Sequence, residues 1–221
     1  MKTSIGYTKE QMAQHVADEL QEDWVVNVGI GLPLTILPYV PVDKDIIFHS
    51  ENGIIGMGPE LADPAQGDND LLSAGKRPVS LIPGASFVNH ADSFVVVRGG
   101  RLDATILGAY QVAENGDLAN WKLPGKRLGS MGGAMDIAVG AKRVLIMMTH
   151  VTSDGRPKIV KTLSYPATAR NCVTKIFTDR AIISVTQRGL VLERLAPGSS
   201  VEDVQAMTEP ALIISEKLKS S

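Results

Sequence analysis

The spacing of apolar positions changes several times along the first fifty residues, which predicts helices and strands in alternation. Thr8 begins a capping box, and the apolar residues that then recur every fourth position predict an amphipathic helix ending near Glu22. A strand is expected over 24–28, a second helix from Pro33, and a further strand over 46–48. This order predicts a parallel sheet with helices on its faces.

Short, almost wholly apolar runs recur through the rest of the chain and fit central strands that are covered on both faces. These runs are residues 79–82, 94–97, 105–107 and 144–148. A late hairpin is expected from 181–186 and 190–193, and Ser200 can cap a last helix over 201–207. Residues 58–70 are polar, with Pro, Gly and Asp, and predict a long loop.

The order of these elements also predicts the fold class. We expect an α/β fold with an open, mostly parallel sheet and helices on both faces. The chain contains no internal repeat, low-complexity tract or obvious linker, so one domain over residues 1–221 is expected.

Composition and charge exclude several function classes. The net charge is -2 and no basic run stands out, so nucleic acid is not expected as a partner. Residues 1–10 lack the pattern of a signal peptide, and no apolar stretch is long enough to cross a membrane. The one cysteine, Cys172, excludes an internal disulfide and fits a reducing, cytoplasmic location. The four histidines are scattered, so no metal site is expected.

The clearest candidate for chemistry is Glu51, within residues 48–53. It follows the apolar run 45–48 and stands between small, polar, turn-forming neighbours. A carboxylate at the end of a core strand is costly to desolvate unless it is paired or used. On this local pattern alone, a surface turn whose glutamate points at water is an equally good interpretation.

A first glycine-rich turn lies between the predicted strand 24–28 and the helix that follows. Gly29 and Gly31 resemble the start of a dinucleotide fingerprint, but Leu34 occupies the position of its third glycine. A nucleotide site is therefore not expected. The backbone N–H groups of this turn could still face an anion or a carbonyl oxygen.

Two further glycine turns allow more than one interpretation. In residues 130–136, Gly132 and Gly133 open a predicted helix and could either donate N–H groups to an oxyanion or allow close helix packing. In residues 98–101, two arginines flank a glycine pair, and a structural salt bridge is favoured over a ligand contact.

In this order, these segments resemble the beta subunit of the 3-oxoacid CoA-transferases, which include the acetoacetate and 3-oxoadipate enzymes. The resemblance runs from the first helix to about residue 195. The segments that carry it are 26–31, 49–53, 92–100, 116–121, 131–136 and 157–160. The Ser-Glu-Asn-Gly element around Glu51 is the most specific of them.

The resemblance implies Glu51 as the nucleophile of the family's reaction. It implies a substrate pocket lined by Asn27 and the turn from Gly29 to Gly31, with Gly132 and Gly133 donating to the thioester oxygen. The residues assigned to substrate binding in this way are Asn27, Gly29, Gly31, Ser50, Asn52, Lys76, Gly132 and Gly133. A separate alpha subunit, which carries its own CoA-binding motif, is the implied partner, in an even heteromer such as α2β2.

The implied reaction transfers CoA from an acyl-CoA, with succinyl-CoA as the usual donor, to a 3-oxoacid. CoA is then a substrate, and no permanently bound cofactor is expected. A free glutamate titrates near 4.3, so Glu51 should be ionised at neutral pH without a base beside it. It would pass through an acyl anhydride to a glutamyl-CoA thioester, in a ping-pong cycle with small carboxylic acids.

Two alternatives stay open at this point. Glu51 could be the general base of an enzyme that isomerises a sugar phosphate. The chain could also be a non-catalytic subunit that binds CoA esters.

Within the family, two departures concern the acyl group: Arg101 replaces a usual histidine, and residues 163–168 replace a usual Cys and Pro-Leu-Thr pattern. No residue is identified for the distal carboxylate of 3-oxoadipate, for which the loop 58–70 and Arg101 are candidates.

Overall fold

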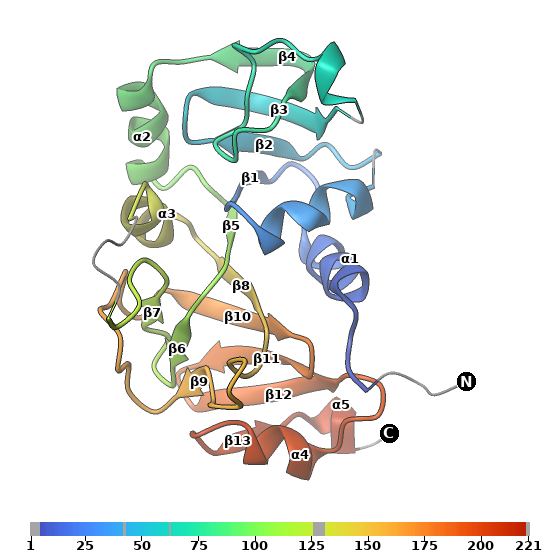
Figure 1. Ribbon diagram of the computed structural model, residues 1–221, viewed down its shortest axis with the longest axis vertical. Helices are drawn as coiled ribbons and strands as arrows, with labels where there is room; N and C mark the ends of the chain where they lie inside the picture. The colour runs from blue at the N-terminus through green and yellow to red at the C-terminus, as the bar shows by residue number, and fades with distance from the viewer. Residues whose placement is uncertain (1–4, 42, 62, 126–130, 220–221) are drawn as a thin grey trace.

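The computed structural model in Figure 1 describes residues 5–41, 43–61, 63–125 and 131–219. Ser130, part of one predicted glycine segment, lies outside these ranges, and the expectation of one domain over 1–221 stays a prediction. The elements in chain order are α1 (Lys9–Glu19), β1 (Val25–Val28), η1 (Leu32–Tyr39), β2 (Ile47–Ser50), β3 (Ile54–Glu60), η2 (Pro64–Gln66), β4 (Val79–Phe87), α2 (His90–Arg98), β5 (Ala104–Leu107), β6 (Gln111–Ala113), β7 (Leu118–Ala119), α3 (Ala134–Gly140), β8 (Val144–Met148), β9 (Ile159–Val160), β10 (Val173–Thr178), β11 (Ala181–Thr186), β12 (Gly189–Leu195), α4 (Val201–Ala206), β13 (Leu212–Ile214) and α5 (Glu216–Lys219).

A ten-stranded sheet runs through the molecule in the order β13-β12-β11-β10-β8-β5-β1-β2-β3-β4. Its central strands, from β10 to β2, are parallel to one another, and antiparallel pairs extend the sheet on both sides. β7, β6 and β9 form a separate small sheet. The predicted α/β class, with an open and mostly parallel sheet, is confirmed.

Helices and loops cover both faces of the central strands. α1 and η1 lie on one face, whereas α2, α3 and the small sheet lie on the other (Figure 1). Alternate side chains of β8 show both layers: Leu145 and Met147 pack with residues of α1, and Ile146 packs with Leu118 and Ile159 of the small sheet. The buried apolar runs noted in the sequence reflect this two-sided burial.

The capping box predicted at the first helix is confirmed. The side chain of Thr8 accepts a hydrogen bond from the Gln11 N–H at 3.2 Å, and the Gln11 side chain accepts one from the Thr8 N–H at 2.9 Å. The helix ends at Glu19, earlier than predicted, because the backbone is already extended at Leu20. The predicted helix after Pro33 is a 3-10 helix, with Pro38 inside it and unable to donate an N–H.

Two sequence-based predictions are wrong. Residues 94–97 lie in helix α2, not in a strand, and the alternation of exposure explains why: Phe94 and Val97 are buried, whereas Val95 is 65% exposed. The apolar run therefore follows the three-residue spacing of a helix face.

The loop predicted over 58–70 is shorter than expected, because β3 continues to Glu60, which is paired with Val79.

Within the described residues, no helix has both the length and the apolar content needed to cross a membrane.

Candidate active site

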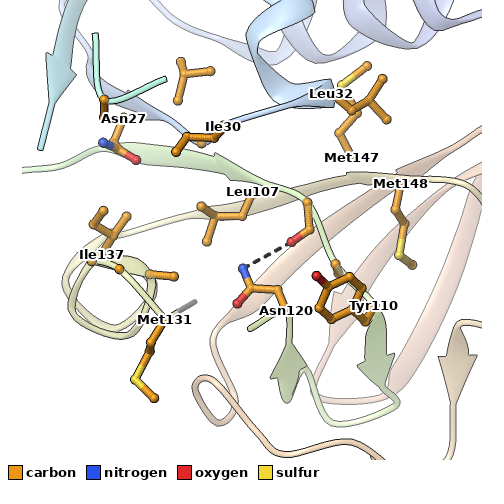
Figure 2. A pocket seen from close by; sticks show the side chains of 18 of the residues that line it. Asn27, Ile30, Leu32, Leu107, Tyr110, Asn120, Met131, Ile137, Met147 and Met148 are labelled. Carbon is orange, nitrogen blue, oxygen red and sulfur yellow. Dashed lines mark hydrogen bonds between the residues drawn. The ribbon is translucent and has the colours of Figure 1, made fainter. Parts of the chain in front are cut away.

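The carboxyl ends of β2, β1, β5 and β8 open onto a cavity of about 490 Å³ (Figure 2). In the sheet, β2 lies on one side of β1 and β5 lies on the other side. The cavity therefore lies at the point where the order of the strands reverses. Open α/β sheets bind their ligands at such a switch point. The loops after these four strands contribute Glu51, Gly29, Gly108 and Thr149 to the lining.

Glu51 begins the tight turn between β2 and β3. Ser50 pairs with Ile54 across the two strands, and the Gly53 N–H donates to the Ser50 carbonyl at 3.0 Å. Gly53 has a φ of 117° and lies against the Val88 carbonyl, so only glycine fits there. The turn therefore has a defined shape, and Glu51 is half-buried on the cavity wall.

Burial raises the pKa of the Glu51 carboxyl, because the surroundings solvate the charged form poorly. A hydrogen bond from the backbone N–H of Gly133 and the charge of His90 oppose this rise without cancelling it. The pKa of Glu51 is therefore higher than that of the free glutamate on which the expected ionisation at neutral pH was based. No basic side chain forms an ion pair with Glu51 among the described residues.

The two glycines before α3 allow close packing, one of the two purposes considered from the sequence, whereas donation to an oxyanion stays a prediction. A Cβ on Gly133 would lie 2.6 Å from Cζ of Phe94 and 3.1 Å from Oε2 of Glu51, so the backbone packs closely against both. Gly132 has a φ of 50°, and a Cβ there would lie 3.8 Å from Oε1 of Glu51. The glycines thus bring the backbone up to the carboxylate itself, where the Gly133 N–H donates to it.

Asn27 lies at the centre of a buried polar row across three strands. It is in register with His49 of β2 and Thr105 of β5. Its amide nitrogen donates to the His49 carbonyl at 3.2 Å, and its amide oxygen accepts from the Thr105 hydroxyl at 3.1 Å. Ser93 of α2 extends the row, with its hydroxyl 2.9 Å from Nε2 of His49. This row links the strand that precedes Glu51 to the helix that carries Phe94.

His49 is a member of this row that sequence reasoning overlooked. Its ring is 1% exposed, and burial lowers its pKa, which favours the neutral ring. From the sequence it counted as a histidine without metal-ligand spacing and as part of the resemblance segment 49–53, with no role of its own. Its place two residues before Glu51 was the available signal.

The structure brings five of the predicted site residues to the cavity wall: Asn27, Gly29, Glu51, Gly132 and Gly133. The other four do not line the cavity. Gly31 has a φ of 90° and is the N-cap residue of η1. Ser50 accepts a hydrogen bond from the Ala74 N–H at 2.9 Å. Asn52 donates to the Leu72 carbonyl at 2.7 Å. Lys76 has a φ of 59° and does not line the cavity.

Other lining residues were not predicted as site residues. Tyr110 and Asn120 come from the ends of β6 and β7, and the Asn120 amide donates to the Gly108 carbonyl at 3.2 Å (Figure 2). Lys158 immediately precedes β9. The sequence placed Asn120 and Lys158 only inside segments of the family resemblance, with no role.

Within residues 98–101, Arg98 confirms the structural salt bridge that the sequence favoured. Arg98 forms an ion pair with Asp136 of α3 at 2.8 Å, which ties α2 to α3. Arg101 is exposed and does not line the cavity. Arg98 and Asp136 do border a second hollow of about 440 Å³, which also reaches Glu51, His90 and Gly133. Glu51 is therefore accessible from two sides.

This arrangement presents a half-buried carboxylate, free of a salt bridge among the described residues, to a space large enough for a small organic acid. The backbone of two glycines lies against the carboxylate. Such a group can act as a nucleophile toward an activated carbonyl or as a general base.

Comparisons with known proteins agree on the family. The coenzyme A transferase family matches over residues 9–207. One subunit of a 3-oxoadipate CoA-transferase from Acinetobacter baylyi is 48% identical over 209 residues, which cover 93% of this chain and 95% of that protein. One subunit of a probable succinyl-CoA:3-ketoacid coenzyme A transferase from Bacillus subtilis is 38% identical, over 96% of this chain and 98% of that protein.

Among solved structures, an acyl-CoA transferase from Escherichia coli O157:H7 superimposes with a TM-score of 0.76 at 21% identity. The match covers 96% of this chain and 42% of that chain, so this chain spans less than half the length of that protein. This likeness supports the fold. With the family match over most of the sequence and full-length relatives well above 30% identity, the chain belongs to the coenzyme A transferase family.

Proposed function

We propose that this chain is the beta subunit of a 3-oxoacid CoA-transferase that works by a ping-pong cycle through Glu51, with succinyl-CoA as the expected donor. The observation that carries the proposal is the placement of Glu51: a half-buried carboxylate on the wall of the switch-point cavity, against the N–H of Gly133. The relatives that belong to 3-oxoadipate and 3-ketoacid transferases support the substrate class.

In the first half-reaction, a Glu51 oxygen attacks the thioester carbonyl, and CoA leaves as a thiolate. The product is an acyl-glutamyl anhydride. The thiolate then attacks the glutamyl carbonyl, which releases the donor acid as a carboxylate and leaves a glutamyl-CoA thioester. The acceptor acid attacks this thioester, and the same steps run in reverse. A carboxylate nucleophile suits this exchange, because the anhydride and thioester both stay activated, whereas a serine would form an ordinary ester.

Each step passes through a tetrahedral oxyanion, which fixed N–H donors stabilise. One such donor is typically worth about 3 kcal/mol. The Gly132 and Gly133 backbone, already against the carboxylate, is the proposed source of donors to the thioester oxygen. The two hollows that meet at Glu51 give the small acid and the CoA thiol separate approaches to the same carbonyl.

A partner chain is part of this proposal. The relatives are each one subunit of such an enzyme, so we propose an alpha subunit that completes the CoA site, in an even heteromer such as α2β2. CoA enters as a substrate, and the proposal requires no resident cofactor.

The test compares Glu51→Gln with the wild type, each co-expressed with the alpha subunit. We expect Glu51→Gln to assemble normally and to lose CoA transfer by roughly 10³-fold or more. Wild type incubated with an acyl-CoA alone should gain a CoA-sized mass on the Glu51 peptide, detected by mass spectrometry. Glu114→Gln, at an exposed glutamate outside the cavity, is the matched control.

Other outcomes would contradict the proposal in recognisable ways. Full transfer by Glu51→Gln would make this chain a non-catalytic partner that only binds CoA esters. If no CoA adduct forms and phosphorylated sugars stabilise the protein instead, Glu51 is a general base of an isomerase-like enzyme.

A further inference from the structure

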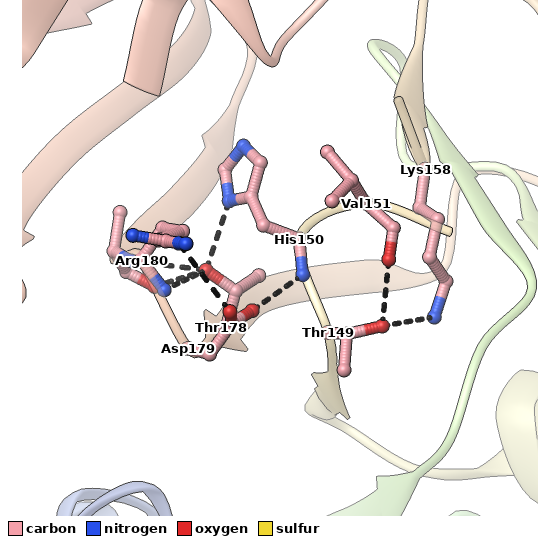
Figure 3. Close-up of polar contacts among 8 residues, drawn as sticks. Thr149, His150, Val151, Lys158, Thr178, Asp179 and Arg180 are labelled. Atoms are coloured by element: carbon pink, nitrogen blue, oxygen red, sulfur yellow. Dashed lines mark hydrogen bonds and ion pairs between the residues drawn. The ribbon is translucent and has the colours of Figure 1, made fainter. Parts of the chain in front are cut away.

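Lys158 is the only basic side chain among the described residues that line the cavity of Glu51. Its backbone is held on both sides: its N–H donates to the His150 carbonyl at 3.2 Å, and its carbonyl accepts from the Val112 N–H at 2.9 Å. The side chain reaches toward Thr149 at the end of β8, with 3.5 Å between Nζ and the hydroxyl (Figure 3). The backbone of Lys158 is therefore held in place, and its ammonium group lies beside Thr149 at the cavity wall.

Within the part of the chain that the structure describes, Lys158 forms no ion pair with an acidic group. The acid that acts on it, Asp179, accepts a hydrogen bond from the His150 N–H at 2.7 Å and forms an ion pair with Arg180 at 3.4 Å. Figure 3 shows Asp179 on the side of His150 and Arg180, away from the end of the Lys158 side chain. Burial lowers the pKa of Lys158 to about 8.

A half-buried cation without an acidic partner is unfavourable, and a bound anion would relieve that cost. Glu51 follows β2 and Thr149 follows β8, which are three strands apart in the sheet. At about 4.8 Å a strand, these ends are roughly 14 Å apart. Glu51 and Lys158 both line the cavity of about 490 Å³ at these strand ends, which is large enough for a short acyl chain.

We propose that Lys158 binds the second, non-reacting carboxylate of a dicarboxylic acyl group, and so makes the enzyme prefer dicarboxylic over monocarboxylic acids. This inference rests on the proposed function, because it takes the first carboxylate or thioester to lie at Glu51. It replaces the two candidates suggested by the sequence, since neither Arg101 nor a described residue of 58–70 lines the cavity.

The first experiment measures kcat/KM for 3-oxoadipate and for acetoacetate with the assembled enzyme. In a ping-pong cycle, kcat/KM for an acid reports only the half-reaction in which that acid takes part. Lys158→Met, which keeps length and removes the charge, should lower kcat/KM for 3-oxoadipate by about 10- to 100-fold relative to acetoacetate, as expected for a lost charge-assisted hydrogen bond. Lys158→Arg should keep most of the preference. Lys161→Met, at an exposed lysine three residues on, is the matched control.

The pH dependence gives a second readout. Because Lys158 loses its proton near pH 8, kcat/KM for 3-oxoadipate should fall above that pH more than kcat/KM for acetoacetate does. The other charged or titratable groups that act on Lys158 or lie beside it are Asp179, Arg180 and His150, and the pKa of His150 lies at about 4, so that ring is already neutral in this range. Lys158→Arg, whose guanidinium keeps its proton, should keep the preference for 3-oxoadipate and abolish its extra fall above pH 8.

A binding measurement separates this inference from the proposed function. In the absence of CoA, adipate should stabilise the assembled protein against heat more than hexanoate does, and Lys158→Met should remove that difference. If CoA transfer through Glu51 occurs but Lys158→Met changes both acids equally, the inference is wrong and the function stands. If adipate binding depends on Lys158 but no CoA transfer occurs, the function is wrong and the anion site stands. Should Lys158→Met fail to fold, Lys158→Gln provides the same comparison.

Discussion

At the scale of single residues, the site depends on how closely Gly133 approaches Glu51. The glycine backbone occupies space between the Glu51 carboxylate and the Phe94 ring, which no side chain could share. This approach lets one N–H contact a carboxylate whose pKa burial has raised. A nucleophile in such surroundings is less solvated than a surface glutamate and is held in one place.

We expect Gly133→Ala to lower kcat/KM for CoA transfer by about 10- to 100-fold, because the new Cβ must displace either Glu51 or Phe94. Adding Phe94→Leu to the same chain should restore part of the activity by making room for the methyl group. Phe94→Leu alone serves as the control, and the three variants form a double-mutant cycle. Equal activity of Gly133→Ala and wild type would show that the close packing has no catalytic role.

At the scale of elements, α2 connects the sheet to the site. Asn89 caps this helix by accepting a hydrogen bond from the Asp92 N–H at 2.9 Å. Ser93 then contacts His49 of β2, and Phe94 packs against Gly133. The same helix is therefore in contact with the strand before Glu51 and with the glycines beyond it, so its position sets the width of the gap that holds the carboxylate.

Removing the N-cap of α2 tests this link. Asn89→Ala should lower the free energy of unfolding by about 0.5–2 kcal/mol and should also reduce CoA transfer. Ser200→Ala removes the N-cap of α4, none of whose residues lines the cavity, and should cost a similar amount of stability with transfer unchanged. Denaturant titration and steady-state kinetics give the two quantities. An equal loss of activity in both variants would mean that general destabilisation, and not the position of α2, is responsible.

At the scale of the whole molecule, the cavity rests on the most buried part of the sheet. All residues of β5 and β8 are buried, whereas β4, at one edge of the sheet, is largely exposed. Strand ends that project from such a centre keep their relative positions, because moving one of them would disturb packing on both faces. The edge strands carry less of this packing.

Hydrogen exchange should report this difference. In the isolated chain, amides of β8 should exchange more slowly than those of β4 by roughly 10²-fold or more, since edge strands open locally while the centre opens with global unfolding. Exchange followed by mass spectrometry would measure both peptides. The isolated chain is the appropriate sample, because a partner packed on an edge would add protection of its own. Equal protection of β4 and β8 would contradict this account of where the fold is stable.

Local sequence determined much of this protein by itself. The capping box at Thr8, the buried strand over Val144–Met148 and the glutamate at a strand end each follow from neighbouring residues, because caps, periodicity and turns are local properties. The order of the motifs along the chain was also enough to identify the family resemblance. Residues 94–97 show the limit, since four apolar residues fit a strand or one face of a helix, and only burial by other elements decides between them.

The tertiary structure alone decided how these parts meet. Glu51 follows β2, Gly133 precedes α3 and Lys158 precedes β9, so only the packing of these elements against one another brings the three residues to one cavity. The raised pKa of Glu51 and the lowered pKa of Lys158 likewise come from desolvation by distant residues. Burial depends on the whole packed fold, so no stretch of sequence contains it.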